Sequence, residues 1–326
     1  MKAWIAQPAA DGIGFELGDI DAPEPAPDEL LVRVCAAGIN RVDQRANTSH
    51  FSHSPAAPVP IPGLEMAGEV VQIGSQVSGF DVGARVAAMV QGGCAEYVRV
   101  KAVLAMRLPA AMSWTVAAAL PVSYLTAHNA LAMLGRLQPG DAVLIHAVTT
   151  GVGLAALQLA ARGGASQILG SSGSAAKLEQ LRERGLDHGL HDPYAGFAPR
   201  VLALTGGLGV PVVVDNIGGS LLDATMSCTA LGGRIVNVGR LGGVQASIDL
   251  NLHALRRIEL LGATFRTRTL AEHAAVVNSF MEKNGPALAD GSLAPLIDRV
   301  FAFDDLPDAV RHSAASGQLG KIVVSF

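Results

Sequence analysis

Between Val143 and Ala160 the chain reads Val143-Leu144-Ile145-His146-Ala147-Val148-Thr149-Thr150-Gly151-Val152-Gly153-Leu154-Ala155-Ala156-Leu157-Gln158-Leu159-Ala160. An apolar run enters a turn of small residues and then a run with helical spacing, which predicts a strand over Ala142–Val148 and a helix over Gly153–Arg162. The first N–H groups of a helix have no intrahelical acceptor, and the positive helix end attracts anions. The stretch therefore predicts a phosphate-binding turn of the kind that holds a dinucleotide.

The turn departs from the G-x-G-x-x-G pattern of dinucleotide-binding proteins. Val148 and Thr150 stand at the first two glycine positions, and only the third, Gly153, is kept, with Gly151 beside Thr150. Thr150 carries a Cβ where a pyrophosphate comes closest, and its hydroxyl could offset the greater distance by donating to phosphate. A turn of small residues also serves plain packing, so the motif gains its weight from its place as the first strand–helix unit of an alternating domain.

Strands and helices alternate from about Ser113 to Phe265. The pattern predicts strands over Ser166–Ser171, Val212–Asn216, Arg234–Val238 and Glu259–Phe265, and helices over Trp114–Leu120, Tyr124–Leu134, Ala175–Arg184 and Leu221–Leu231. The strands are largely apolar, as expected when helices cover both faces of a sheet. This alternation predicts the α/β class with a doubly wound parallel sheet.

The segment before it, from Met1 to about Pro109, has short apolar runs broken by Gly and Pro. Its predicted strands are Leu30–Val34, Gly68–Ile73, Arg85–Val90 and Ala95–Val100, which indicates a β-rich, barrel-like domain. The tail is predicted to return to this domain. It holds an amphipathic helix over Ala271–Lys283, a strand over Val300–Phe303, a helix near Leu306–Ala315 and a strand over Lys321–Ser325.

The end of the second strand of the parallel sheet bears on the choice of cofactor. NAD sites usually place an acidic residue there to bind the ribose 2′-hydroxyl. Here Ser171, Ser172, Gly173 and Ser174 follow, with Lys177 in the next helix and no carboxylate. Hydroxyls and a cation suit a 2′-phosphate, so NADP(H) is favoured. The serines could also merely cap the helix, and both interpretations hold together if a phosphate shares that helix end.

Composition excludes several other classes of protein. The chain has 326 residues, enough for two domains, and 50% of them are hydrophobic. Its net charge of −4, without a basic stripe, argues against nucleic acid as the main partner. Its three cysteines are odd in number and far apart, which favours a reducing compartment. We find no signal-peptide pattern and no apolar run of about 20 residues, so we expect a soluble cytoplasmic protein without a membrane partner.

With these residues identified, the chain resembles the zinc-independent quinone oxidoreductases of the medium-chain dehydrogenase/reductase superfamily. The matching segments run through almost the whole chain and are highly specific for the superfamily in this order. They are Ala36–Asp43, Pro62–Val70, Gly92–Val98, Leu120–Ala127, the phosphate-binding turn, Gly232–Val236 and Gly320–Val324. They are less specific for the substrate.

The resemblance implies an architecture and an assembly. It implies a GroES-like catalytic domain over residues 1–121 and 267–326, a Rossmann NADP(H)-binding domain over residues 122–266, and an active site in the cleft between them. It also implies a homodimer, commonly formed through edge strands of the Rossmann sheets.

The resemblance also implies that no metal takes part. Zinc relatives place a cysteine where Asn40 stands and a histidine where Leu64 stands, and neither ligand is present. Relatives with a structural zinc carry a four-cysteine lobe after the segment Gly92–Val98. This chain has only Cys94 in that region and continues through Arg99, Val100 and Lys101. The nine histidines do not group with the cysteines at ligand spacing, so we predict no metal site.

The resemblance nominates further site residues. Candidate catalytic hydrogen-bond donors are Asn40, Arg45 and Tyr124; Asn40 could instead cap the turn after a strand, and Tyr124 could be a packing aromatic. Candidate substrate-binding residues are His50, Phe51 and Arg266, although Arg266 could be a surface charge and His50 a solvated loop residue. Candidate cofactor-binding residues are Thr126, Thr149, Thr150, Gly151, Val152, Gly153, Ser171, Ser172, Gly173, Lys177, Asn216, Val238 and Gly239.

Without a Lewis acid, reduction of an activated acceptor remains feasible, because a quinone or an α,β-unsaturated carbonyl delocalises the incoming charge onto oxygen. We therefore expect an NADPH-dependent, zinc-independent reductase of quinones or enones. One alternative is an enoyl-thioester reductase or an enone reductase of a particular pathway. An alternative of another class is a non-catalytic nucleotide-binding regulator, which the threonine in the phosphate-binding turn would suit.

Overall fold

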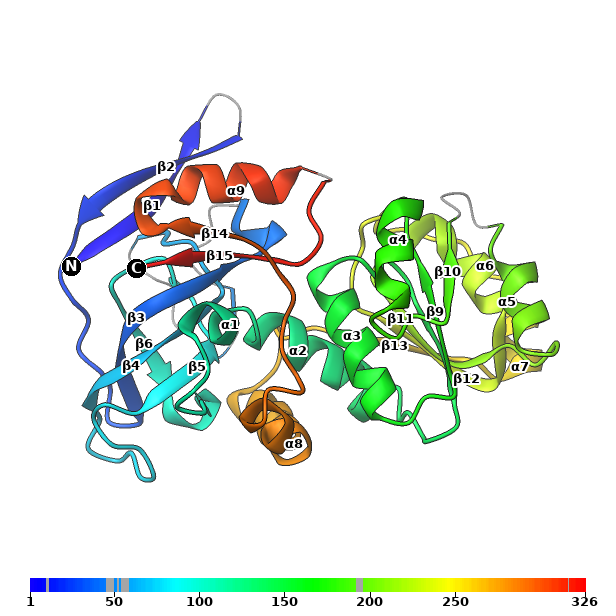
Figure 1. Cartoon of the computed structure of the whole chain (residues 1–326), viewed down its shortest axis with the longest axis horizontal. Coiled ribbons are helices and arrows are strands. Elements are labelled where there is room, and N and C mark those ends of the chain that lie inside the picture. Colours follow the sequence, from blue (N-terminus) through cyan, green and yellow to red (C-terminus); the bar gives the residue numbers. More distant parts are fainter. Residues whose placement is uncertain (10–11, 45–49, 52, 54–58, 192–195, 316) are drawn as a thin grey trace. The chain divides into compact units, whose positions relative to one another are not determined.

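The computed structural model describes residues 1–9, 12–44, 50–51, 53, 59–191, 196–315 and 317–326. The chain divides into two compact units, which we describe separately (Figure 1). Unit 1 comprises Met1–Leu125 and Phe265–Phe326, and unit 2 comprises Thr126–Thr264. Unit 1 contains a mixed sheet and unit 2 a parallel sheet, so the predicted α/β class is confirmed.

Unit 2 is built on a six-stranded sheet in which every neighbouring pair of strands is parallel. In spatial order the strands are β10 (His188–Leu190), β9 (Gln167–Ser171), β8 (Ala142–Ile145), β11 (Val210–Asp215), β12 (Thr229–Asn237) and β13 (Glu259–Gly262). The order reverses between β8 and β11. Ligands of doubly wound sheets bind outside the carboxyl ends of the strands at such a reversal, which is where the phosphate-binding turn lies.

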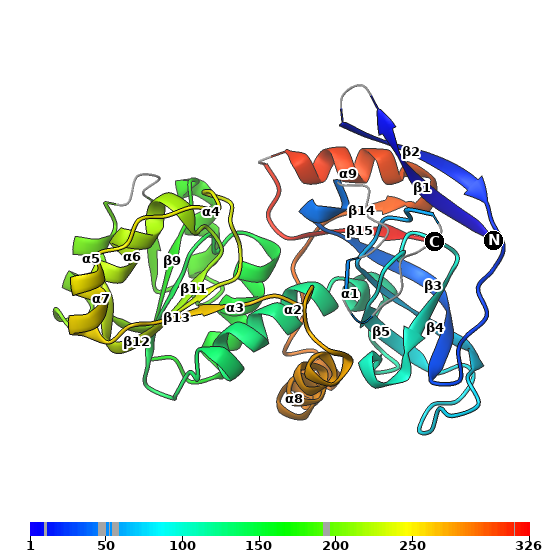
Figure 2. The ribbon, with the colours of Figure 1, turned by 180° about the vertical axis from the view of Figure 1, so that it is seen from behind.

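Helices pack on the sheet of unit 2 because its strands are apolar on both faces (Figure 2). Their bounds are α3 (Gly151–Arg162), α4 (Ala175–Arg182), α5 (Ala198–Leu204), α6 (Leu222–Ser227) and α7 (Leu250–Arg256), with a π-helix over Asn129–Leu134 and a 3₁₀ turn over Gly219–Leu221. One buried cluster joins Leu144 and Val213 of the strands to Val201 of α5 and Met226 of α6. Burying such aliphatic side chains stabilises the fold by about 1.5–3 kcal/mol each.

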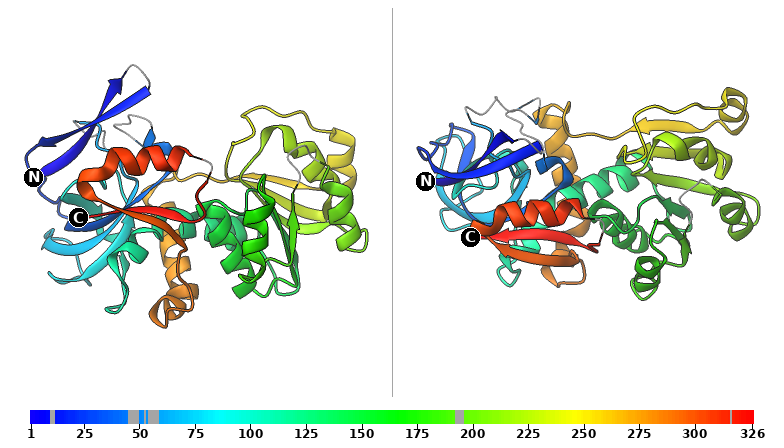
Figure 3. Two further views of the ribbon diagram at one scale, coloured as in Figure 1. Left: turned by 45° about the horizontal axis from the view of Figure 1, so that its top comes forward. Right: turned by 90° about the horizontal axis from the view of Figure 1, so that it is seen from above.

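Unit 1 is organised around the long strand β3, which lies at the centre of a seven-stranded sheet (Figure 3). The strands are β14 (Ile297–Ala302), β15 (Lys321–Ser325), β3 (Glu29–Ile39), β4 (Glu65–Ile73), β5 (Arg85–Met89) and β7 (Met106–Arg107), with β6 (Tyr97–Lys101) paired to β3. A separate antiparallel hairpin consists of β1 (Lys2–Ala9) and β2 (Gly12–Asp19). β15 pairs with β3, so the tail returns to the first domain as predicted.

The helices of unit 1 come from both parts of the chain. Their bounds are α1 (Trp114–Ala118), α2 (Pro121–His128), α8 (Leu270–Ala289) and α9 (Leu306–Ala314), with 3₁₀ turns over Arg41–Gln44, Ala102–Leu104 and Phe303–Asp305. The last three residues of α2, from Thr126 on, belong to unit 2. α9 packs Leu306 and Val310 against Ile322 of β15. Within the described part of the chain, no helix combines the length and the apolar character that crossing a membrane requires.

Several element boundaries differ from the sequence prediction. The predicted strand Ala142–Val148 ends at Ile145, because Ala147 has a left-handed backbone (φ 50°) that starts the turn. The predicted helix Leu221–Leu231 ends at Ser227, and Thr229 already belongs to β12. The prediction also omits the hairpin of β1 and β2, although each strand has eight residues, and the seven-residue helices α5 and α7, whose runs are short.

Candidate functional site

The phosphate-binding turn connects β8 to α3, and Thr150 caps the helix. The Thr150 hydroxyl accepts a hydrogen bond from the Gly153 N–H at 3.2 Å and donates one to the Ala147 carbonyl oxygen at 2.8 Å. The single proton of this hydroxyl is therefore used inside the turn. In this structure the proton goes to the Ala147 carbonyl oxygen while the hydroxyl oxygen caps the helix, so donation to a phosphate would require the hydroxyl to leave that carbonyl.

Gly153 allows the start of α3 to lie against the turn. A Cβ on this residue would lie 2.4 Å from the Ala147 carbonyl oxygen and 2.6 Å from Val148 Cα, closer than real Cβ contacts. Gly153 thus serves the helix–strand packing that the sequence assigned to it. Because the cap uses the Gly153 N–H, Gly151 and Val152 supply the remaining N–H groups of the first turn. This cradle fits the pyrophosphate of a dinucleotide.

The end of β9 reaches the same turn. Thr149 Oγ1 lies 3.2 Å from Ser172 Oγ, which brings two predicted cofactor-binding residues together. Ser174 caps α4 by accepting from the Lys177 N–H at 3.4 Å, so the capping interpretation of these serines is confirmed for Ser174. Gly173 is open, since a Cβ there would have nothing within 4 Å among the described residues. Ser172, Gly173 and Lys177 thus surround one helix start.

Ser171 ends β9, as the sequence predicts, and its side chain belongs to a buried chain of hydrogen bonds. Thr225 Oγ1 donates to the Leu221 carbonyl oxygen and therefore accepts from His146 Nε2, at 2.9 Å. His146 Nδ1 then accepts from the Ser171 hydroxyl at 2.8 Å. Burial lowers the pKa of His146 to about 4, so the ring is neutral, as this assignment requires. Ser171, predicted to bind the cofactor, is only 4% exposed, and its hydroxyl donates its hydrogen bond to His146.

The carboxyl ends of β11 and β12 are also fixed by hydrogen bonds. Asn216 is buried, and its Nδ2 donates to the His146 carbonyl oxygen at 2.9 Å, which ties the end of β11 to that of β8. The backbone N–H groups of Val238 and Gly239 donate to the carbonyl oxygen of Asp215 at 2.8 and 3.1 Å. These predicted cofactor-binding residues therefore gather at the strand ends, where a dinucleotide lies in such sheets.

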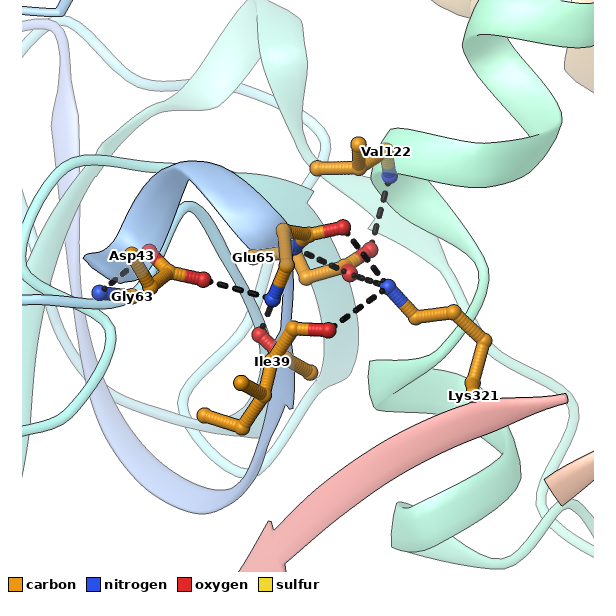
Figure 4. A network of polar contacts seen from close by, with 8 residues as sticks. Ile39, Asp43, Gly63, Glu65, Val122 and Lys321 are labelled. Carbon is orange, nitrogen blue, oxygen red and sulfur yellow. Dashed lines mark hydrogen bonds and ion pairs between the residues drawn. The ribbon is translucent and has the colours of Figure 1, made fainter. Parts of the chain in front are cut away.

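In unit 1, Asn40 belongs to a polar network with Glu65 and Lys321. The latter two come from β4 and β15, and their buried ion pair is drawn in Figure 4. Asn40 Nδ2 donates to Glu65 Oε1 at 2.8 Å, and Asn40 Oδ1 accepts from Lys321 Nζ at 2.8 Å. Lys321 Nζ also lies 2.6 Å from Glu65 Oε1. Glu65 Oε2 accepts from the Val122 N–H at 2.7 Å, so the carboxylate also holds the start of α2. The sequence analysis missed the role of Lys321, and only its place in a matched segment could have signalled it.

Asp43 holds the turn that follows Asn40. Its carboxylate accepts from the Asn40 N–H at 2.7 Å and from the Gly63 N–H at 3.0 Å (Figure 4). Burial raises the pKa of Asp43 to about 6, although these two N–H groups act in the opposite direction. The group therefore has the structural role that hydrogen bonding to backbone implies.

The zinc of metal-containing relatives does not fit these side chains. Both amide atoms of Asn40 are already hydrogen-bonded, Leu64 offers no ligand atom, and the Lys321 ammonium lies beside Asn40 with a positive charge that opposes a cation. No three His, Cys, Asp or Glu side chains gather to hold a metal ion anywhere in the described ranges.

Two of the predicted substrate-binding residues lie in an aromatic cluster of unit 1. The rings of His50 and Phe51 are 4.8 Å apart, and Phe51 stacks on His53 at 5.6 Å. The sequence analysis missed His273 of α8, whose Nδ1 lies 3.1 Å from His53 Nε2. His273 is fully buried, and its Nε2 has no hydrogen-bond partner among the described residues. Its helical spacing alone could not distinguish it from a core residue.

The remaining predicted residues are more dispersed. Tyr124 is 2% exposed, and its ring packs 6.3 Å from the ring of Phe280, as the packing interpretation expected. Thr126 is half-buried on α2. Burial lowers the pKa of His50 to about 4, and the charge of Arg266 acts in the same direction. Arg45 lies outside the described residues.

Two family models match the chain. Residues 26–110 match an alcohol dehydrogenase GroES-like domain, and residues 151–280 match a zinc-binding dehydrogenase domain. The first range lies in unit 1, and the second covers the whole of α3, five of the six strands of the parallel sheet and the first part of α8.

Curated relatives match along almost the whole chain. A phenolphthiocerol/phthiocerol polyketide synthase protein of Mycobacterium tuberculosis is 34% identical over 94% of this chain. The chain spans only 14% of that protein's length. The quinone oxidoreductase-like protein 2 of Rattus norvegicus is 31% identical over 94% of this chain and 87% of its own.

Solved structures show the same architecture. The quinone oxidoreductase of Thermus thermophilus, whose structures include a complex with NADPH, has a TM-score of 0.83 and 30% identity over the full length of both chains. The CurK enoyl reductase has a TM-score of 0.84 and 26% identity, and the match covers 99% of this chain and 98% of that one.

Proposed function

The chain belongs to the medium-chain dehydrogenase/reductase superfamily and is a quinone oxidoreductase-like enzyme that binds a nicotinamide cofactor, and from this premise we propose a reaction. We propose that the enzyme reduces quinones or α,β-unsaturated carbonyl compounds with NADPH and without zinc. One observation carries the proposal. Asn40 and Leu64 stand where zinc relatives have ligands, and a buried ammonium holds the Asn40 amide there. The chain therefore offers a fixed hydrogen-bond donor where those relatives offer a Lewis acid.

The residues of the chain would position the reactants. A bound nicotinamide supplies the hydride. Gly151 and Val152 hold the pyrophosphate through their N–H groups, and Val238 and Gly239 approach the nicotinamide ribose. Asn40 donates a hydrogen bond to the oxygen on which negative charge develops, with Arg45 and Tyr124 as further donors. His50, Phe51 and Arg266 line the acceptor site, and the aromatic rings suit a planar acceptor.

The decisive test compares acceptors. NADPH oxidation is followed by absorbance with 1,4-naphthoquinone, with an α,β-unsaturated ketone and with an enoyl thioester. We expect the quinone and the ketone to have the higher kcat/KM. Tight NADPH binding without oxidation by any acceptor would instead support the non-catalytic regulator.

An enoyl-thioester reductase is the second candidate. The polyketide synthase match and the likeness to the CurK enoyl reductase favour it. The same assay separates the two functions, because a thioester preference would raise kcat/KM for the enoyl thioester above that for the quinone.

NADP(H) is the proposed cofactor because Ser172 and Lys177 adjoin one helix start. We expect Lys177→Ala to raise KM for NADPH about tenfold and to leave KM for NADH unchanged, since one lost charge-assisted hydrogen bond is worth about 1.5 kcal/mol. Arg182→Ala, in the last turn of α4, is the matched control and should change neither value. Equal effects of Lys177→Ala on both cofactors would contradict the 2′-phosphate assignment.

We also propose a homodimer that forms through β13, the edge strand of unit 2. The outer edge of β13 presents backbone hydrogen-bonding groups, and Leu260 on this strand is 39% exposed. Leu250 and Leu255 of the preceding helix α7 are each 70% exposed. A second copy would cover these side chains and pair with the edge.

A further inference from the structure

The ion pair of Lys321 and Glu65 is more completely bonded than a salt bridge that only holds strands together needs to be. Lys321 is 6% exposed, and Glu65 is fully buried. The three N–H groups of the ammonium are matched by three acceptors, which are Asn40 Oδ1, Glu65 Oε1 and the Ile39 carbonyl oxygen at 3.3 Å (Figure 4). Replacing such a pair with apolar residues is often neutral or stabilising, so stability alone does not account for it.

The pair fixes which way the Asn40 amide faces. An ammonium can only donate, so it selects the amide oxygen, and a carboxylate can only accept, so it selects the amide nitrogen. A flip of the amide would place donor against donor and acceptor against acceptor. The backbone N–H of Asn40 is held as well, by Asp43 at 2.7 Å. Residues from β4 and β15 thus set one orientation of this side chain.

These contacts use only one of the two N–H groups of the Asn40 side-chain amide. Asn40 Nδ2 uses one hydrogen on Glu65, and for the other the described residues offer only the Gly38 carbonyl oxygen at 3.5 Å, the limit of a hydrogen bond. Asn40 is partly exposed. Because the Lys321 ammonium withdraws charge through the amide oxygen, this second N–H becomes a stronger donor.

We infer that Lys321 and Glu65 are positioning residues that orient and polarise the Asn40 amide, so that its second N–H becomes the donor to the acceptor's carbonyl oxygen. The inference rests on the proposed function, in which Asn40 touches the acceptor. Gly38 shows how closely Glu65 is seated, since a Cβ there would lie 2.5 Å from Glu65 Oε1 and 2.6 Å from the Ala118 carbonyl oxygen. The carboxylate therefore occupies the space that a side chain at position 38 would need.

The first experiment needs no turnover. The side-chain NH₂ signals of Asn40 are assigned in a ¹⁵N-labelled protein as the pair that Asn40→Ser removes. In the wild type we expect both protons downfield of the other asparagine signals, and in Lys321→Met we expect them to move upfield. Signals that Lys321→Met leaves in place would overturn the inference, whether or not the protein reduces any acceptor.

The second experiment separates positioning from stability. Lys321→Met leaves a buried carboxylate unpaired and should lower both Tm and kcat with naphthoquinone, the latter about 10²-fold, with KM for NADPH unchanged. The double variant Glu65→Gln/Lys321→Met restores neutrality and should recover most of the Tm but not kcat. Lys321→Arg should recover part of kcat, because it keeps a cation.

Lys101→Met is the matched control, because Lys101 forms a more exposed ion pair with Asp28 and Glu29 in the same unit. It should leave kcat unchanged. Recovery of kcat together with Tm in the double variant would reduce the pair to a structural role and overturn the inference. If none of the acceptors supports NADPH oxidation by the wild type, the proposed function is contradicted instead. The NMR result would still decide whether Lys321 polarises the Asn40 amide.

Discussion

Gly153 is a residue at which a single added carbon should harm the nucleotide site. In Gly153→Ala the new Cβ meets backbone atoms of Ala147 and Val148, which cannot rotate away. We expect the free energy of unfolding to fall by about 1–3 kcal/mol, as for overpacked cores, and NADPH affinity to fall with it. Urea unfolding and NADPH titration check both.

Gly317→Ala is the control for that substitution, because Gly317 is exposed and a Cβ there meets nothing within 4 Å in the described chain. It should change stability by less than about 0.5 kcal/mol. An equal loss in the two variants would mean that the tight contact at the start of α3 contributes little.

For single residues, the sequence predicts roles better than it predicts hydrogen-bond partners. The packing function of Gly153 follows from the fingerprint alone. That the Thr150 hydroxyl donates to Ala147, and that of Ser171 to His146, could not be predicted, because each hydroxyl has one proton and several acceptors within reach. Lys321 lies 256 residues along the chain from Glu65, a separation over which no local pattern carries information.

At the scale of elements, the neutral side chain of His146, which follows β8, forms hydrogen bonds to Ser171 of β9 and Thr225 of α6. The stability of this junction should therefore decrease on acidification. Burial lowers the pKa of His146 to about 4, below the usual 6.5. Between pH 4 and 6.5 the imidazole is therefore protonated in the unfolded chain and neutral in the folded chain. Stability contributed by His146 is complete above pH 6.5 and is lost as pH falls toward 4. The loss is at most about 1.4 kcal/mol per pH unit.

Urea unfolding between about pH 7.5 and 5, on either side of the ordinary histidine pKa, measures this effect. In His146→Gln the stability should be lower near neutral pH but should fall less steeply on acidification than in the wild type. His191→Gln, which changes an exposed histidine, should keep the wild-type slope. Parallel pH profiles for wild type and His146→Gln would show that other groups cause the acid sensitivity.

Elements are predicted best where apolar runs are long. The strands around the turn, and helices α3, α4, α8 and α9, follow from the sequence because their periods are clear. The prediction extends the six residues of α6 too far, because Thr229–Leu231 are apolar enough to continue a helix until the pairing of β12 with β11 decides otherwise. Tertiary pairing overrides local preference there.

For the molecule as a whole, the exposed edge of unit 2 predicts the oligomeric state. If two copies pair through β13, Leu260→Lys places a lysine on the edge strand of each copy. The charges should repel, and the measured mass should fall from that of a dimer to that of a monomer. Light scattering during size-exclusion chromatography measures this.

Leu208→Lys is its control, because Leu208 is 77% exposed but precedes β11. It should keep the two-chain mass. A wild type with one-chain mass would contradict the dimer, and a two-chain Leu260→Lys would move the interface away from β13.

The order of the chain has a consequence for synthesis on the ribosome. Unit 2 is a continuous segment, so its six strands are all available once residue 264 has emerged. The sheet of unit 1 must wait for β15, which pairs with β3 and carries Lys321. Until then the Glu65 carboxylate, which precedes Lys321 by 256 residues, lacks the countercharge of the Lys321 ammonium. The chain order therefore allows the nucleotide-binding sheet to form first, and the strand that completes the other sheet also brings the countercharge for Glu65.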